Sequence, residues 1–73
     1  MEGQLQQVLG RNLRRLRLER GYSQEDFAEL LHVHRTYLGS VERGERNLTL
    51  RTVERLADDL GIEAVGLLVE SGQ

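Results

Sequence analysis

Residues 23–43 read SQEDFAELLHVHRTYLGSVER and contain two short helical patterns on either side of a tight connection. Ser23 is a good N-cap, because its side chain can accept a hydrogen bond from an amide of the first helical turn. Glu25 and Asp26 follow in that turn, where the helix dipole favours negative charge. The first short helix then has a buried face of three apolar residues: Phe27, Leu30 and Leu31.

A second short helix is predicted from about His34 to Arg43, with Leu38 and Val41 pointing inward. Its polar face consists of residues at helical spacing: Arg35, Thr36, Gly39, Ser40 and Arg43. Two helices joined so tightly predict a helix-turn-helix if the second exposes a polar face to DNA. The spacing alone fits a DNA-contacting face and the ordinary solvent-exposed face of a surface helix equally well.

Arg35 and Thr36 occupy the N-terminal end of this second helix, the end that enters the major groove first. An arginine there can donate two hydrogen bonds to guanine O6 and N7, and a threonine can contact a base or a phosphate. Gly39 removes a side chain, which would let the backbone approach a ligand closely.

The rest of the chain also has helical periodicity and no strand signals. One apolar stripe consists of Leu5, Leu9, Leu13 and Leu16, and glycines at 21, 44 and 61 punctuate the chain. Thr49 is the expected cap of a fourth helix, whose apolar face is Leu50, Val53, Leu56, Ala57 and Leu60. A fifth helix is expected over residues 62–69. We therefore predict an all-α, compact five-helix fold that forms a single domain over residues 1–73, with its core at about 9–69.

Composition narrows the function classes. The 73 residues include ten cations, all arginine, and the net charge is −2, which by itself argues against nucleic acid. The excess of acidic residues lies C-terminal to residue 46, so a local basic surface can still form in the N-terminal part of the chain. The chain has no cysteine, no long apolar run and no phosphate loop, so we expect a cytoplasmic protein without membrane contact, catalysis or cofactor. We interpret His32 and His34 as surface residues of a turn and expect no metal site.

Two longer stretches resemble a known family. Residues 16–28, LRLERGYSQEDFA, resemble the opening of the lambda-repressor-like (XRE-type) helix-turn-helix domains, and residues 34–44, HRTYLGSVERG, resemble their recognition helix. Residues 43–50, RGERNLTL, are similar to the controller proteins of bacterial restriction–modification systems, although most of the wider family has proline where Leu48 stands. The resemblance covers roughly residues 9–68.

The resemblance implies a role for each matching position. Arg35 and Thr36 correspond to the main base-reading residues, with Ser40 and Gly39 beside them. The residues expected to grip the DNA backbone or flank the groove are Ser23, Gln24, Tyr37, Arg43, Arg46 and Asn47. Arg17 and Glu42 correspond to a buried ion pair that ties the first helix to the third. Glu25 and Glu29 correspond to an acidic patch that touches RNA polymerase in phage activators, but we prefer to interpret them as a solvated face favoured by the helix dipole.

The last helix is more apolar than a monomer needs. Part of its apolar set must close the core, and the remainder would be an exposed patch of the kind that marks a partner. The expected dimer contacts are Leu60, Ile62, Val65, Leu67 and Leu68. A two-fold dimer would place two recognition helices about 34 Å apart, one turn of DNA, on a partly palindromic site. The resemblance adds that two dimers can bind adjacent sites.

The leading functional prediction is a sequence-specific transcriptional regulator that binds a double-stranded operator as a homodimer. The resemblance implies control of its own gene and of a companion restriction endonuclease gene. A phage-type repressor and an antitoxin that regulates its own synthesis are alternatives within DNA binding. A protein-interaction adaptor that does not bind DNA is an alternative from another class, supported by the negative net charge.

Overall fold

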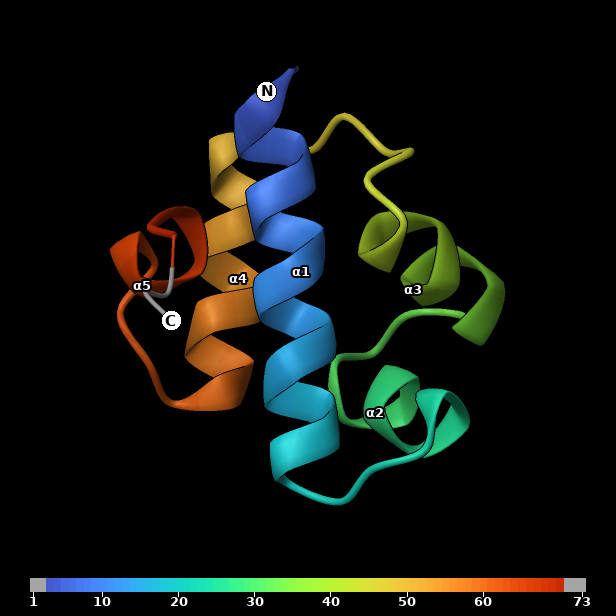
Figure 1. Ribbon diagram of the computed structural model, residues 1–73. Coiled ribbons are helices and arrows are strands. Elements are labelled where there is room, and N and C mark those ends of the chain that lie inside the picture. The colour runs from blue at the N-terminus through green and yellow to red at the C-terminus, as the bar shows by residue number, and fades with distance from the viewer. Residues whose placement is uncertain (1–2, 71–73) are drawn as a thin grey trace.

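A computed structural model describes residues 3–70 as five helices without a strand among them. The helices are α1 (Gln4–Glu19), α2 (Gln24–Leu30), α3 (Arg35–Glu42), α4 (Leu50–Leu60) and α5 (Val65–Leu68). In Figure 1, α2 and α3 lie on one side of the long helix α1, and α4 and α5 lie on the other. The all-α, five-helix prediction is confirmed, while the domain expected over residues 1–73 extends at both ends beyond the described residues.

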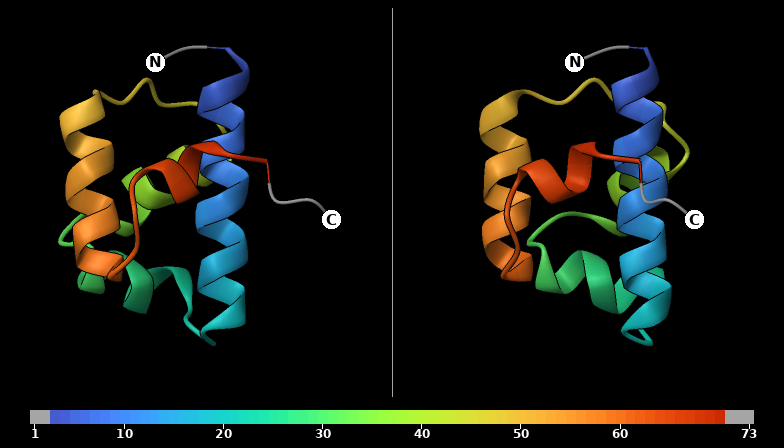
Figure 2. Two further views of the ribbon diagram at one scale, coloured as in Figure 1. Left: turned by 90° about the vertical axis from the view of Figure 1, so that its left-hand side faces the viewer. Right: turned by 60° about the vertical axis from the view of Figure 1, so that its left-hand side comes forward.

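The first turns of α1 and α4 lie at the same end of the molecule, and α5 crosses the space between these two helices (Figure 2). Asn12 fixes this crossing, because its Nδ2 donates to the Leu67 carbonyl at 2.8 Å and to the Val69 carbonyl at 3.0 Å. Within residues 3–70 no helix combines the length and the apolar character that crossing a membrane requires.

Local capping sets the helix boundaries. The Ser23 and Thr49 hydroxyls accept hydrogen bonds from the amides of Asp26 at 3.0 Å and Thr52 at 3.1 Å, so both predicted N-caps are confirmed. Gly61 ends α4 in the left-handed conformation, at φ 72°, which glycine adopts without steric cost.

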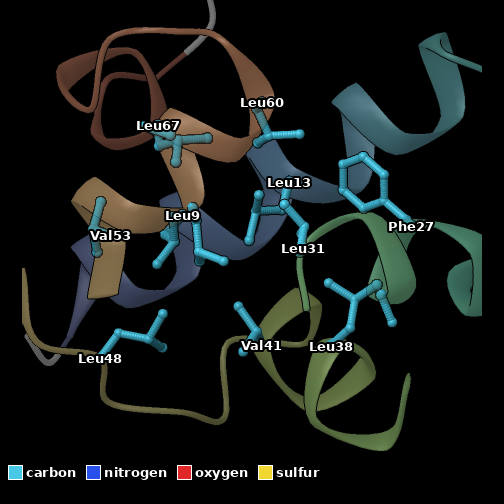
Figure 3. Close-up of a cluster of buried hydrophobic side chains, with 13 residues drawn as sticks. Leu9, Leu13, Phe27, Leu31, Leu38, Val41, Leu48, Val53, Leu60 and Leu67 are labelled. Atoms are coloured by element: carbon cyan, nitrogen blue, oxygen red, sulfur yellow. The ribbon is translucent and has the colours of Figure 1, made fainter. Parts of the chain in front are cut away.

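The core is one apolar cluster to which all five helices contribute (Figure 3). Its members with no or almost no exposed surface include Leu9, Leu13, Phe27, Leu31, Leu38, Val53, Leu56 and Leu67. Fully burying one such side chain stabilises a fold by about 1.5–3 kcal/mol, so this cluster is the main source of stability for so short a chain.

Two members of the predicted apolar stripes are outside this core. Leu5 is 46% exposed and Leu50 is 63% exposed, because each lies in the first turn of its helix, beyond the part that packs against neighbours. Leu30 and Leu16 are only partly buried at its margin. The spacing of apolar residues shows which side of a helix faces the core, but it does not show along how much of its length neighbouring helices cover that side.

The fifth helix is shorter than expected, four residues rather than the span 62–69. The Ile62 amide donates back to the Ala57 carbonyl at 3.0 Å and closes the end of α4, so residues 61–63 form a turn. Val69 is already extended, at φ −102° and ψ 134°.

Two of the expected dimer contacts are core residues instead. Leu60 is 5% exposed and Leu67 is 0% exposed within the single chain, so neither can contribute apolar surface to a partner without unpacking the fold. Ile62 and Leu68 are half-buried against the core, and Val65 is 63% exposed. The sequence correctly suggested that part of this set closes the core, but it did not separate the two groups.

Candidate nucleic-acid interface

The connection between α2 and α3 places the second helix across the first. His32 adopts φ 60°, and the Val33 amide donates to the Ala28 carbonyl at 2.9 Å. His34 is the N-cap of α3, because its Nδ1 accepts a hydrogen bond from the Thr36 amide at 3.0 Å. An imidazole thus takes the part that serine, threonine or aspartate usually plays at this position.

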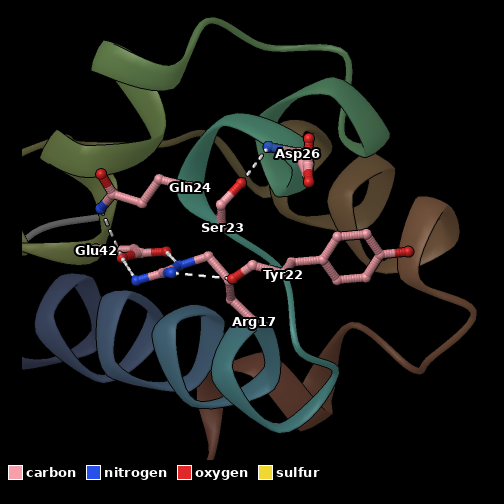
Figure 4. Close-up of polar contacts among 6 residues, drawn as sticks. All are labelled: Arg17, Tyr22, Ser23, Gln24, Asp26 and Glu42. Atoms are coloured by element: carbon pink, nitrogen blue, oxygen red, sulfur yellow. Dashed lines mark hydrogen bonds and ion pairs between the residues drawn. The ribbon is translucent and has the colours of Figure 1, made fainter.

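The structure brings Arg17 of α1 and Glu42 of α3 together as a two-pronged ion pair (Figure 4). Arg17 Nε and Nη2 donate to the two carboxylate oxygens of Glu42 at 2.7 and 3.1 Å. Arg17 Nη1 also donates to the Tyr22 carbonyl at 3.2 Å, so the pair fixes the loop before α2 as well. The side chains are 10% and 4% exposed, which makes Glu42 part of the scaffold rather than of a surface for DNA.

Gln24 adds a third partner to this pair from α2. Its Nε2 donates to Glu42 Oε1 at 3.0 Å, while the residue itself remains exposed (Figure 4). Gln24 therefore links the start of α2 to the end of α3, the bracing position that the resemblance implies. Ser23 is exposed beside it, and its hydroxyl accepts the capping hydrogen bond of α2.

Gly10 sets the distance between α1 and α3, a role that the sequence analysis missed. A Cβ atom at this position would lie 2.7 Å from the Glu42 carbonyl oxygen and closer still to that of Val41. Only a glycine lets the two helix backbones approach so closely. The one signal in the sequence is a glycine inside an otherwise regular helical pattern, next to the buried Leu9.

Arg35 and Thr36 are exposed in the first turn of α3. Within residues 3–70 neither side chain makes a hydrogen bond or ion pair. The C-terminal end of the same helix is held by the Arg17–Glu42 pair and by the contact at Gly10. The two residues expected to read bases are thus presented outward from a helix that is anchored at its other end.

Ser40 and Gly39, which the resemblance places beside the base-reading residues, are both buried in the single chain. Ser40 is 8% exposed, and its hydroxyl donates to the Tyr37 carbonyl at 2.7 Å and accepts from Arg46 Nε at 3.0 Å. Gly39 lies beneath the ends of two longer side chains: a Cβ there would be 3.3 Å from Arg43 Nη1 and 3.7 Å from Gln24 Nε2. Both positions therefore support neighbours that are exposed.

The segment after α3 carries further polar residues. Arg43 is exposed, with its Nε 3.2 Å from a carboxylate oxygen of Glu45. The Arg46 guanidinium stacks on the Tyr37 ring, 5.1 Å from its centroid, and Tyr37 is half-buried. Asn47 is also exposed. These residues extend the polar surface from the first turn of α3 into residues 43–47.

On α2, Glu25 and Glu29 are both exposed, one helical turn apart. Together with Asp26, His34 and Arg35 they line a shallow surface hollow between α2 and α3. In the part of the chain that the structure describes, no three acidic, histidine or cysteine side chains are grouped as a metal site would require.

Comparison with known proteins identifies the family to which this geometry belongs. A helix-turn-helix family model matches residues 13–67. The chain is 44% identical to the control protein C.SmaI of Serratia marcescens, over 93% of this chain and 81% of that protein. Among solved structures, the restriction–modification controller C.AhdI from Aeromonas hydrophila has a TM-score of 0.75 and 44% identity, covering 85% of this chain and 94% of that one.

A third similar structure is the C.Esp1396I controller tetramer in complex with its natural 35 base-pair operator, with a TM-score of 0.76 and 33% identity. The likeness covers 90% of this chain and 87% of that chain. The family model, the identities and the anchored α3 agree. The chain belongs to the helix-turn-helix family of DNA-binding transcriptional regulators, in the group that includes the control proteins of restriction–modification systems.

Proposed function

We propose that this chain is the controller of a restriction–modification system and binds a partly palindromic operator as a homodimer. The observation that carries the proposal is the exposure of Arg35 and Thr36 at the free end of a helix whose other end is fixed by the buried Arg17–Glu42 pair. A fixed helix delivers side chains to the major groove in one register, which specific recognition of base edges requires.

In this proposal Arg35 donates to a guanine edge, and Thr36 contacts the neighbouring base or its phosphate. Gln24, Arg43, Arg46 and Asn47 contact the sugar–phosphate backbone, which fixes the register of the helix without reading sequence. All four are exposed around the ends of α2 and α3. The regulated genes are, by similarity to the control proteins, its own gene and a companion endonuclease gene.

The dimer is proposed to form through α5. Val65 and Val69 are 63% and 55% exposed, and the half-buried Ile62 and Leu68 lie beside them. A two-fold interface would cover these residues in both copies at once. Two such dimers on adjacent sites would give a tetramer, as in the operator complex of C.Esp1396I.

Val65→Glu tests this interface, with Leu50→Glu as its matched control. Both side chains are 63% exposed, so neither substitution disturbs the core, but Leu50 lies at the start of α4. Sedimentation should show monomers for Val65→Glu and dimers for Leu50→Glu. Dimers in both variants, at the same protein concentration, would exclude α5 as the interface.

The acidic surface of α2 is proposed to contact RNA polymerase when the protein activates transcription. Glu25 and Glu29 are exposed, and neither is among the residues proposed to contact the DNA backbone. Glu29→Ala should then lower activated transcription while operator affinity stays the same. Unchanged activation would leave the two carboxylates as a solvated, dipole-favoured face.

The experiment that tests the function is selection of bound sequences from a random pool of double-stranded DNA. A controller should enrich a partly palindromic site whose half-sites are about 10 base pairs apart between centres. Gel shifts at several salt concentrations should then show weaker binding as salt rises. A chain that enriches no sequence and binds no DNA in a salt-sensitive way would be an interaction adaptor instead.

A further inference from the structure

Ser40 has an arrangement of hydrogen bonds that the proposed DNA contacts do not explain. Its hydroxyl donates to the Tyr37 carbonyl, three residues earlier in the same helix, at 2.7 Å. A serine hydroxyl has one proton to donate, so this bond fixes its orientation and leaves its lone pairs for an acceptor role. The Nε–H of Arg46 donates to that oxygen at 3.0 Å. The bond joins α3 to the segment that follows it.

A second contact holds the same arginine. The Arg46 guanidinium lies over the Tyr37 ring, with its central carbon 5.1 Å from the ring centroid, within the range of a cation–π interaction. Tyr37 thus contributes its ring to Arg46 directly and its carbonyl to Ser40. The three residues close a small ring of contacts in which Arg46 is the exposed member and Ser40 the buried one.

This ring of contacts leaves the far end of the guanidinium available. The contact with Ser40 uses only Nε–H, and within residues 3–70 no protein acceptor receives a hydrogen bond from the two terminal nitrogens of Arg46. Those nitrogens carry four of the five donors of an arginine. A phosphate oxygen pair matches this fork, and Arg46 then needs no further ordering when it binds.

We infer that Ser40 is a positioning residue that orders Arg46 for contact with a backbone phosphate of the operator. The inference rests on the proposed DNA binding and replaces the base-reading role expected for Ser40. A buried hydroxyl whose donor is already used cannot present a donor to a base edge. It can remove the rotational freedom of a long side chain before DNA arrives, which is a cost that binding would otherwise carry.

The test is a double-mutant cycle of Ser40→Ala and Arg46→Ala, measured on the selected operator and on random DNA. Ordering one rotamer-rich side chain costs about 0.5–1.5 kcal/mol, so Ser40→Ala should weaken binding about 2–10-fold per protomer, equally on both DNAs. Arg46→Ala should lower the salt slope by about one per protomer, because one phosphate contact is lost. In the Arg46→Ala chain, adding Ser40→Ala should leave the DNA affinity and the salt slope unchanged.

Matched variants separate positioning from other roles. Ser40→Thr keeps the hydroxyl and should keep the affinity of the unmodified chain. Arg14→Ala removes one exposed arginine from α1 and should leave the salt slope unchanged. Ser40→Ala should melt at the normal temperature, since the Nε–H that it releases belongs to an exposed residue and returns to water.

Three outcomes would overturn the inference. The first is that Ser40→Ala lowers DNA affinity by the same factor in the unmodified chain and in the Arg46→Ala chain. The second is that Ser40→Ala changes which base is preferred at an operator position. The third is read without DNA: nuclear magnetic resonance relaxation at Arg46 Nε should show a side chain that becomes mobile in Ser40→Ala, and unchanged mobility contradicts positioning. If the unmodified chain binds no DNA, the proposed function fails, and this last measurement still decides whether Ser40 orders Arg46.

Discussion

Gly10→Ala is the substitution for which the structure predicts the largest effect from the smallest chemical change. A methyl group at this position would lie 2.7 Å from the Glu42 carbonyl oxygen and 3.0 Å from its carbonyl carbon. A carbon and a carbonyl oxygen in contact normally lie about 3.3–3.6 Å apart. The helices α1 and α3 would therefore have to separate by at least about 0.6 Å, and both neighbours are backbone atoms that cannot rotate away.

The magnitude combines three effects. Overpacking of this kind costs about 1–3 kcal/mol, and alanine offsets it by about 1 kcal/mol through its better helix propensity. The same separation lengthens the Arg17–Glu42 hydrogen bonds of 2.7 and 3.1 Å, and loss of a buried ion pair partner costs about 3–5 kcal/mol. With part of that loss included, we expect a destabilisation of about 3 kcal/mol, or roughly 12–24 °C in melting temperature.

Thermal and urea unfolding followed by far-ultraviolet circular dichroism measure this effect at one fixed protein concentration. Gly66→Ala is the matched control, because a Cβ at Gly66 meets nothing within 4 Å and this glycine lies in the short helix α5. It should be neutral or slightly stabilising. If Gly10→Ala melted within a few degrees of the unmodified chain, the close approach of α1 and α3 would not be what positions the recognition helix.

Three further substitutions test the interface and its scaffold. Arg35→Ala should relax base preference at one operator position, by about 1–3 kcal/mol of discrimination, and equal losses on operator and random DNA would contradict base reading. Glu42→Ala should cost about 3–5 kcal/mol of stability, whereas Glu45→Ala, which removes an exposed acid, should cost little; retained stability with altered operator choice would make Glu42 a reading residue. His34→Ala should cost about 1 kcal/mol through the lost cap of α3, and His34→Asn should restore it in thermal unfolding; equal melting of all three chains would show that the imidazole does not cap the helix.

Most of the fold could be predicted because its determinants are local. Ser23 and Thr49 cap their helices through amides three residues away, and Leu9 and Leu13 lie on a stripe visible in the sequence. The limits of the stripes depend on neighbours, which is why Leu5 and Leu50 are exposed although they continue the pattern.

The candidate site divides in the same way. The exposure of Thr36 follows from helix phase, since it precedes the inward-facing Leu38 by two residues, and Arg35 is exposed as the first residue of α3. The inward position of Ser40 does not follow from helix phase alone, because it depends on Arg46 folding back over Tyr37 from the next segment. Helical spacing describes one helix and contains no information about what packs on its far side.

The net charge of −2 does not argue against DNA binding, because many of the charges form ion pairs away from the polar surface of α3. Arg17 is neutralised by Glu42 inside the fold. Three further pairs, Arg11–Glu70, Arg15–Glu19 and Arg55–Asp59, lie on α1, on α4 and in the segment after α5. Charges farther than about 8 Å from a phosphate are largely screened at physiological salt, so what the DNA meets is the local set.

On α3 and residues 43–47 the exposed cations are Arg35, Arg43 and Arg46. Glu45 pairs with Arg43, and the exposed acids Glu25, Asp26 and Glu29 of α2 line the same hollow as Arg35. The three arginines are enough to contact a few phosphates and one base edge. Non-specific binding depends on the number of phosphates neutralised, and specific binding also depends on base contacts. We therefore expect an acidic protein with this small group of arginines to bind random DNA weakly and to gain its selectivity from the short-range contacts that a correctly placed α3 makes.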